Sequence, residues 1–411
     1  MRRVLFLLLL AFVPALVNVS TATGQERLLV HMVQPGDTWT ALAWRYNLGP
    51  VELAQASRRM NRQRQPAAGT TLLLPDKGEE RFGRIERTYG GLLELSLRYG
   101  LSPWALAVSN GVKHPFRPLL YRPVFIPGGS APPRDLPIGF HTLELSQLPA
   151  HPGEGVAIRA TTSPSLTVSV TLDDIPLATL SQNGHLVGVA GTGAFFSSGA
   201  PELTVIPAGG PLWPQPWRFD DRDWDFEQIT LTGSAAAIDS ASIAAEYERL
   251  SALWAQVETG PLWEGAFQFP ITSYLEISSH YGARRSYNGG PYRSYHEGVD
   301  FSAYGGTAVT AAAAGRVVLA EQLYVRGNAV IIDHGVGVYT GYYHLSNLLV
   351  SQGQFVNGGD PIGAVGSTGL STGNHLHWDL LVGGVWVDAA AWRAEGTACW
   401  ILEGLGLVCD S

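Results

Sequence analysis

The chain has 411 residues, of which 45% are hydrophobic and 15% are charged, and its formal net charge is −8. This length exceeds what one ordinary core requires, so we expect roughly two to four domains, and the composition excludes a largely disordered chain. Binding to nucleic acid requires a basic surface, whereas arginines cluster here only briefly, over residues 58–64. Nucleic acid is therefore excluded as an expected partner.

The N-terminus has the layout of a secretory signal. Two arginines precede an apolar run that reaches Val19, and small residues follow around Ala22–Gly24. The run is marginal in length for crossing a bilayer, so it predicts a signal peptide over residues 1–24, with an uncleaved membrane anchor as the alternative. In both cases we expect the rest of the chain to be exported, without a further membrane span.

Only two cysteines are present, Cys399 and Cys409. In an exported protein they can pair and close a short loop near the C-terminus. Two thiols cannot form a four-sulfur metal site, so the ligands of any metal are sought among histidines and carboxylates.

Residues 29–76 predict a small module of strand, two helices and strand. A Pro-Gly turn precedes Asp37 and Thr38, either of which can cap the first helix, and the segment ends in an apolar strand that stops at Pro75. With its Gly36-Asp37-Thr38 sequence and the later Asn61, the segment resembles the lysin motif (LysM). The resemblance implies binding of N-acetylglucosamine-containing glycans.

Residues 83–128 repeat this plan, and such an internal repeat indicates tandem modules. Leu92, Leu95 and Asn110 follow the spacing of the first copy, but Tyr89-Gly90-Gly91 stands in place of Gly-Asp-Thr. We expect a degenerate second LysM-like module that keeps the fold, and the altered turn puts its sugar binding in question.

Two further segments separate these modules from the C-terminal part. Residues 136–233 contain short alternating stretches between Gly-, Pro- and Asp-rich turns, which predict a β-sandwich spacer of immunoglobulin-like type. Residues 235–258 carry Ile243, Tyr247 and Leu250 at helical spacing and predict a linker helix.

Residues 265–395 contain two pairs of potential metal ligands with short spacings. His375 and His377 belong to an alternating segment, and in a strand residues two apart share one face at about 6–7 Å. One of these imidazoles can ligate zinc while the other faces a reacting water.

His296 and Asp300 form the second spacing. A straight strand would separate them by about 13 Å, and Gly298 with Val299 argues against a helix. We therefore expect the chain to bend at Gly298, with His296 in a loop and Asp300 in a strand over 299–302. A carboxylate with two imidazoles suits Zn²⁺ with one position left for water.

A peptide hydrolase also requires a base, and the sequence has no HExxH helix to supply a glutamate. His344 and His375 are the available candidates. His334 ends an apolar strand and is interpreted as structural, while for His280 a loop role and a position near the substrate groove are both left open.

The C-terminal part resembles the catalytic domain of the lysostaphin-type zinc endopeptidases. Four stretches carry the resemblance: Ser279–Arg285, His296-x-Gly298-x-Asp300-Phe301, Tyr342–Ser346, and Gly366–Gly369 with Gly373–Trp378. The resemblance implies that His296, Asp300 and His377 bind one Zn²⁺ and that His344 and His375 act on the water and the transition state. It also implies an antiparallel β-sheet core with a narrow groove, and wall peptides as substrates. Asn374 and Tyr343 depart from the common pattern, but neither replaces a reactive group.

The sequence thus predicts a multidomain, mainly β protein that contains LysM modules, a β-sandwich spacer, a linker helix and a zinc peptidase domain. The predicted function is hydrolysis of stem or cross-bridge peptide bonds in peptidoglycan by an exported, wall-associated or secreted enzyme. The alternative is a catalytically silent wall-binding protein that activates a separate amidase, and such a protein would have a broken ligand set. A glycan-binding role of the first module would complement the enzymatic one.

Overall fold

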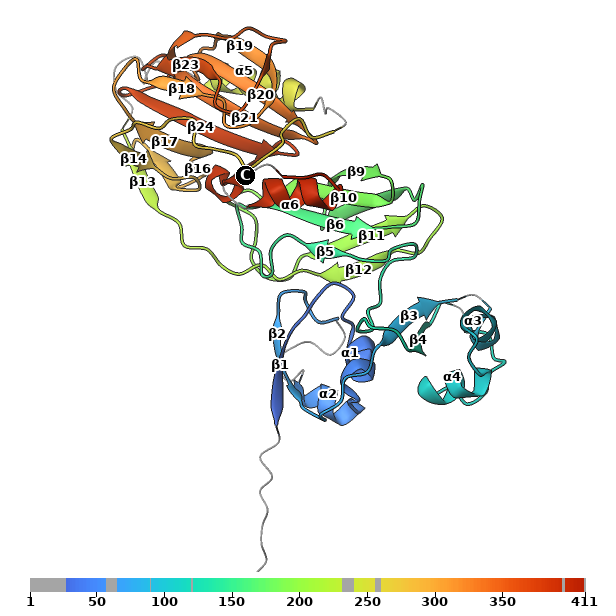
Figure 1. Cartoon of the computed structure of the whole chain (residues 1–411). Coiled ribbons are helices and arrows are strands. Elements are labelled where there is room, and N and C mark those ends of the chain that lie inside the picture. Colours follow the sequence, from blue (N-terminus) through green and yellow to red (C-terminus); the bar gives the residue numbers. More distant parts are fainter. Residues whose placement is uncertain are drawn as a thin grey trace, which may run out of the picture.

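The computed structural model describes residues 27–56, 65–88, 90–119, 121–230, 240–255, 260–393 and 396–409. The predicted signal peptide and the arginine cluster lie outside these residues. The described part is a multidomain, mainly β protein, with the N-terminal modules at one end, a β-sandwich in the middle and the C-terminal domain at the other end (Figure 1). No helix in these ranges is long and apolar enough to cross a membrane.

Both N-terminal modules have the predicted strand–helix–helix–strand order, and in each the two strands pair antiparallel. Thr38 caps the first helix by accepting from the backbone N–H of Ala41, while Asp37 is fully buried beside His31. The elements are β1 (Leu28–Met32), α1 (Trp39–Tyr46), α2 (Pro50–Ala56) and β2 (Thr71–Pro75), then β3 (Gly83–Arg87), α3 (Leu92–Tyr99), α4 (Pro103–Ser109) and β4 (Pro123–Pro127).

The predicted spacer contains two four-stranded sheets in the orders β5-β6-β10-β9 and β12-β11-β7-β8. Apolar side chains of both sheets share one core, which makes the unit a sandwich. Its strands are β5 (Glu144–Leu145), β6 (Gly155–Thr161), β7 (Val168–Leu172), β8 (Ile175–Pro176), β9 (Ala178–Gln182), β10 (His185–Gly191), β11 (Glu202–Pro207) and β12 (Trp213–Pro216).

The first module is joined to this sandwich by specific hydrogen bonds. The buried side chain of Gln215 accepts from the backbone N–H of Gly36 at 2.9 Å and donates to the carbonyl of Pro66 at 3.0 Å. Backbone bonds between Ala68 and the segment that follows β12 extend the contact. The module is therefore held against the sandwich rather than only tethered to it.

One strand leaves the predicted spacer. β13 (Phe226–Ile229) falls within residues 136–233, yet it pairs in parallel with β15 (Arg284–Tyr287), which also pairs with β16 (Ser294–Tyr295). The ring of Phe226 packs edge-on against Tyr292. The sequence that follows β12 therefore crosses to the C-terminal domain before the predicted linker helix begins.

The C-terminal domain is built on a ten-stranded sheet whose strand pairs are all antiparallel. Its central strands are buried along most of their length because both faces are covered, as the apolar run Val330–Ile332 illustrates. The strands are β14 (Glu276–Ser279), β17 (Gly298–Ser302), β18 (Ala308–Thr310), β19 (Gly315–Gln322), β20 (Asn328–Gly335), β21 (Val338–Leu348), β22 (Phe355–Val356), β23 (Pro361–Val365), β24 (His375–Val382) and β25 (Val385–Val387).

A short 3₁₀-helix (Ala389–Trp392) and α6 (Thr397–Gly404) follow the sheet. A disulfide joins Cys399 to Cys409, the pairing that the sequence allowed. The helix α6 packs against β6 and β10 of the sandwich, where the guanidinium of Arg159 lies over the Trp400 ring. The C-terminal segment therefore links the last domain to the sandwich.

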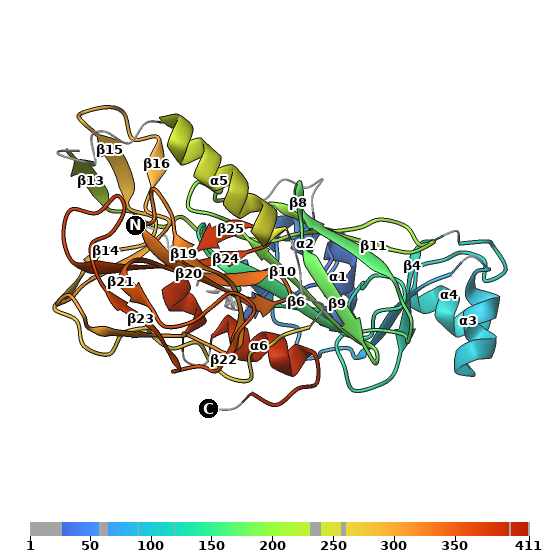
Figure 2. The same ribbon diagram turned by 90° about the horizontal axis from the view of Figure 1, so that it is seen from above.

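The predicted linker helix is α5 (Ser240–Trp254), and the remainder of 235–258 lies outside the described residues. Leu250 and Trp254 are buried in the core of the C-terminal domain, and Trp254 packs edge-on against Trp386. Seen from above, α5 runs from the side of β15 and β16 toward the sandwich (Figure 2). The helix is thus a packed part of the C-terminal domain.

Because Leu250 is fully buried, Leu250→Ala should lower the free energy of unfolding by about 2–5 kcal/mol through lost burial and a residual cavity. Ile243→Ala on the same helix is the matched control, since Ile243 is 44% exposed and its truncation should have little effect. Denaturant unfolding followed by tryptophan fluorescence measures both. Equal, small effects of the two substitutions would show that α5 is not integral to the domain.

Candidate metal centre and active site

Three side-chain donor atoms converge beside the β17–β24 strand pair of the C-terminal sheet. Nε2 of His296 lies 3.0 Å from Nδ1 of His377 and 3.1 Å from Oδ1 of Asp300, and the last two atoms are 2.8 Å apart. A tetrahedral zinc ion with bonds of about 2.0–2.1 Å requires ligand atoms roughly 3.3–3.4 Å apart. The distances between the three atoms are thus a few tenths of an ångström shorter than those around a bound zinc ion. Among the described residues, His296, Asp300 and His377 form a group that could hold a metal ion.

Strand register explains two of these positions. β17 and β24 are antiparallel neighbours, and Asp300 lies directly opposite His377. Side chains of directly opposed residues have Cβ atoms only about 4.5–5.5 Å apart, which allows a carboxylate and an imidazole to meet one ion. His375 points to the same face of β24 two residues earlier, opposite Ser302.

The third donor enters from a loop, as the sequence predicted. His296 follows the short strand β16 and is fully buried, and β17 begins at Gly298. A Cβ atom at position 298 would lie 2.8 Å from Nε2 of His377 and would also collide with the carbonyl oxygen of Trp378. Glycine is required there because the turn passes directly against the neighbouring ligand strand.

The second nitrogen of His296 is also held. Its Nδ1 lies 2.7 Å from Oγ of Ser279 and 3.1 Å from the carbonyl oxygen of His280. Arg285 donates to Oγ of Ser279 at 3.0 Å, and its guanidinium lies 3.5 Å from Oδ2 of Asp300. Such partners orient ligand side chains and set which ring nitrogen carries the proton.

His344 reaches the site through an irregularity in β21. The β20–β21 register shifts between Asn328 and Val330, and His344 itself has φ of +62°, which is unusual for a residue other than glycine. Its backbone N–H donates to the carbonyl of Arg326, and its Nδ1 donates to the carbonyl of Thr368 at 2.8 Å. The bulge therefore turns the imidazole toward β24, with Nε2 left unprotonated.

His375 completes the group. Its Nδ1 donates to the carbonyl of Gly373 at 2.9 Å, and its Nε2 lies 3.9 Å from Oδ1 of Asp300. The ring centres of His344 and His375 are 4.8 Å apart, and those of His344 and His377 are 6.3 Å apart. All five residues predicted from the sequence thus lie together.

Burial and mutual charge set the protonation of the cluster. Burial would raise the pKa of Asp300, but His296 and His377 beside it hold that pKa well below its usual range. Burial, with smaller contributions from the nearby His375 and His377, lowers the pKa of His344 to about 3. Near neutral pH the carboxylate is therefore charged and His344 is neutral, so it can accept a proton.

The two remaining histidines of interest lie away from the donor atoms. His334 is fully buried, donates from Nδ1 to the carbonyl of Ala314 and packs edge-on against Phe267, so its role is structural, as interpreted from the sequence. The imidazole of His280 is exposed in a loop 3.8 Å from Asp225, and only its backbone carbonyl approaches the site.

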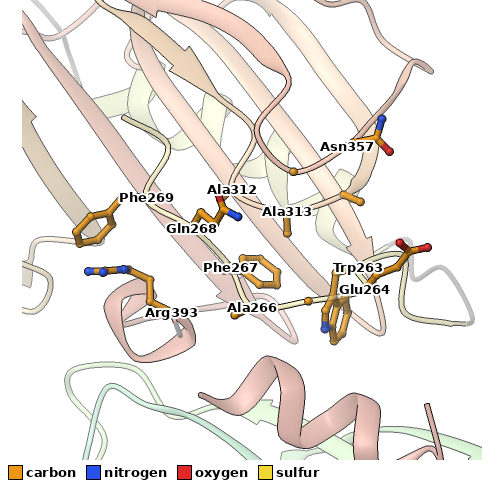
Figure 3. A pocket seen from close by; sticks show the side chains of 13 residues that line it. Trp263, Glu264, Ala266, Phe267, Gln268, Phe269, Ala312, Ala313, Asn357 and Arg393 are labelled. Atoms are coloured by element: carbon orange, nitrogen blue, oxygen red, sulfur yellow. The ribbon is translucent and has the colours of Figure 1, made fainter. Parts of the chain in front are cut away.

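A separate cavity of about 570 Å³ lies elsewhere in the domain (Figure 3). It is lined by the segment Trp263–Phe269, by Ala312 and Ala313 and by Arg393, whose guanidinium stacks on Phe269. None of the five predicted site residues lines it. The candidate site on β17 and β24 is therefore distinct from this cavity.

Two regions of the chain are similar to known protein families. Residues 294–389 match Peptidase family M23, and residues 31–75 match the LysM domain. The chain is 40% identical over 133 residues to the peptidoglycan DD-endopeptidase ShyA of Vibrio cholerae, covering 32% of this chain and 31% of that protein. It is 42% identical over 121 residues to the DD-carboxypeptidase/endopeptidase Mpg of Neisseria meningitidis, covering 29% and 28% of the two chains.

Among solved structures, a peptidase M23 structure from Pseudomonas aeruginosa aligns with a TM-score of 0.43 and 24% identity, covering 60% of this chain and 94% of that chain. The chain spans less than a third of the length of the two curated relatives. The three converging donors define a candidate metal centre. The chain contains a Peptidase family M23 domain preceded by a LysM domain.

Three supporting residues were not assigned roles from the sequence. Ser279 and Arg285 belong to one of the stretches that resemble the peptidase family, so the sequence already indicated that they lie near the site. Glu227, which binds both, lies on β13 about fifty residues earlier in the chain, and no local pattern marks it.

The buried His334 predicts a pH effect on stability. Burial lowers its folded pKa to about 4, below the ordinary value of 6.5. Between these values the unfolded chain binds a proton that the folded chain does not, so stability is complete above pH 6.5 and falls as the pH drops toward 4. The loss from this group reaches about 3 kcal/mol.

Comparison of wild type with His334→Gln isolates this contribution. With zinc chelated, the difference in unfolding free energy between the two proteins should shrink by about 3 kcal/mol from pH 7.5 to pH 4. Urea titrations at several pH values measure it. A difference that stays constant over this range would contradict the assignment.

Proposed function

We propose that the chain is a zinc-dependent endopeptidase that hydrolyses peptide bonds of bacterial peptidoglycan. One observation carries the proposal: the donor atoms of His296, Asp300 and His377 lie within 3.1 Å of one another, with His344 and His375 directly beside them. One carboxylate and two imidazoles suit zinc, and one ion per chain would fill the cluster. When bound, zinc supplies Lewis acidity that polarises a peptide carbonyl and activates water near neutral pH.

We assign acid–base roles to the other two histidines. His344 is neutral and directs its proton at Nδ1 to the Thr368 carbonyl, so its Nε2 can accept the proton of the attacking water. His375 directs Nδ1 to the Gly373 carbonyl, so its Nε2 is the nitrogen that faces the reacting group. The carbonyls of Thr368 and Gly373 each accept from Nδ1 of one ring, so both rings keep the tautomer in which Nε2 is available to accept a proton.

Peptidoglycan as the substrate is supported by the curated relatives and by the first module. ShyA is named a peptidoglycan DD-endopeptidase and Mpg a DD-carboxypeptidase/endopeptidase, so a D,D-peptide bond is the first substrate to test. The LysM domain over residues 31–75 would hold the enzyme on N-acetylglucosamine-containing glycan. An exported, wall-associated location fits both parts.

The catalytically silent alternative has less support. A wall-binding protein that only activates an amidase has no need to retain a complete set of reactive groups. Here all five predicted residues are present and lie together around the adjacent strands β17, β24 and β21. The structure therefore favours the enzyme.

The ligand assignment predicts that His377→Ala abolishes both zinc binding and cleavage. Loss of one of three ligands should reduce peptidoglycan cleavage at least about 100-fold, and chelation of wild type should do the same until zinc is restored. Elemental analysis and chromatography of released wall fragments measure the two properties. His280→Ala is the control, because its exposed imidazole is not a donor. Full activity of zinc-free protein would overturn the proposal.

The acid–base assignment predicts a different result for His344→Ala and His375→Ala. Each should keep stoichiometric zinc but lose about 10²–10⁴-fold in kcat, the usual contribution of a positioned acid or base. Parallel zinc analysis and turnover on a cross-linked stem-peptide dimer separate the two properties. If either variant lost its zinc as completely as His377→Ala, that residue would have to be reassigned as a ligand.

A further inference from the structure

We propose that Glu227 is a positioning residue of the metal centre, although it lies on a strand that precedes the matched peptidase region. It acts on His296 through Ser279 and on Asp300 through Arg285. The inference rests on the proposed zinc site and adds to it a carboxylate from outside the region that matches the family, residues 294–389.

The contacts of Glu227 are short and use both carboxylate oxygens. Oε1 accepts from Oγ of Ser279 at 2.6 Å, and Oε2 accepts from Nε of Arg285 at 2.9 Å. Glu227 is three-quarters buried, and Arg285 is more so. Water therefore competes little for these hydrogen bonds, which makes them stronger than exposed ones.

The direction of the hydrogen bonds follows from what each group can donate. An ionised carboxylate only accepts, so the single proton of the Ser279 hydroxyl goes to Glu227. The hydroxyl oxygen can then only accept from its other neighbours, Nη2 of Arg285 at 3.0 Å and Nδ1 of His296 at 2.7 Å. His296 must carry its proton on Nδ1, which leaves the lone pair of Nε2 for the metal.

The carbonyl of His280 supports the same tautomer from 3.1 Å, so loss of Glu227 should weaken the arrangement without abolishing it. The carboxylate adds a charge at the outer end of the chain of hydrogen bonds. A polarised hydrogen bond to the second nitrogen raises the basicity of a ligating imidazole. A loss of zinc affinity is therefore expected rather than a loss of the site.

Glu227 also restrains Arg285. The guanidinium lies only 3.5 Å from Oδ2 of Asp300, close enough to compete with a metal for that carboxylate. The bond from Nε to Glu227 keeps the guanidinium on the outer side, where it can hold Oδ2 while Oδ1 stays with the imidazoles. Neutralising Glu227 would free Arg285 to move toward Asp300.

The backbone holds Glu227 in place independently of its side chain. In the parallel pairing of β13 with β15, Glu227 is the register partner of Arg285. The N–H of Arg284 donates to the carbonyl of Asp225, and the N–H of Asn288 donates to that of Ile229. A substitution that changes only the charge at position 227 should therefore leave the strand in place.

The test measures zinc affinity in the full-length chain by competition with a chromogenic chelator at pH 7.5. Glu227→Gln should weaken zinc binding by about 10–100-fold, the usual effect of removing such a partner. The matched control is Glu276→Gln, which removes an equal charge from an exposed position on β14 and should change affinity less than about twofold. The melting temperature of each zinc-free protein should be unchanged.

Ser279→Ala breaks the same chain of hydrogen bonds without altering β13. In the Ser279→Ala background, Glu227→Gln should have a smaller effect than in wild type, because the two residues act on His296 together. If Glu227→Gln folds poorly, Ser279→Ala alone tests the same chain of hydrogen bonds and should also weaken zinc binding.

Wild-type affinity in Glu227→Gln would overturn the inference and leave the proposed function standing. So would a fall in the melting temperature of zinc-free Glu227→Gln together with additive effects of the two substitutions, since that pattern indicates a merely structural role. Failure of wild type itself to bind zinc would overturn the proposed function and this inference with it.

Discussion

Asp300 and His377 face each other across the β17–β24 pair, and the candidate metal centre depends on that register. Because side chains alternate along a strand, a slip of one residue would turn one ligand to the opposite face. The register is stabilised from both sides: β24 also pairs with β21, and the apolar residues of these strands are buried between two covered faces. Because β24 is paired on both sides, the sheet keeps Asp300 and His377 directly opposite each other.

Around that pair, each further group enters through a local departure from regular strand. His296 comes from the turn before Gly298, and His344 comes from a bulge with a left-handed backbone. Two segments that precede the matched peptidase region complete the surroundings. Glu246 of α5 accepts from the backbone N–H groups of Val325 and Arg326, next to the carbonyl that binds His344, while β13 supplies Glu227. The functional unit is thus larger than the region that the family defines.

Much of the site could be predicted from the sequence because its signals are local. The two-residue spacing of His375 and His377 indicates that both side chains lie on the same face of a strand. Gly298, between His296 and Asp300, indicates a bend in the chain. The mainly β architecture and the paired βααβ modules follow from alternation and repetition in the same way. The end of the spacer could not be placed, since β13 is a short strand whose partner lies far along the chain. The role of Glu227 could not be predicted for the same reason. A hydrogen bond between segments far apart in the chain produces no periodic pattern in the sequence of either segment.

The contacts of Gln215 with the first module, and of α6 with β6 and β10, have a consequence for reach. They join the sandwich to the first module and to the C-terminal domain, which lie on opposite sides of it (Figure 1). If the first module bound glycan, the C-terminal domain would lie at a fixed separation from the bound sugar. The sandwich would then act as a rigid spacer. It would favour peptides that lie at a particular distance from the bound sugar, in addition to any preference for their chemistry.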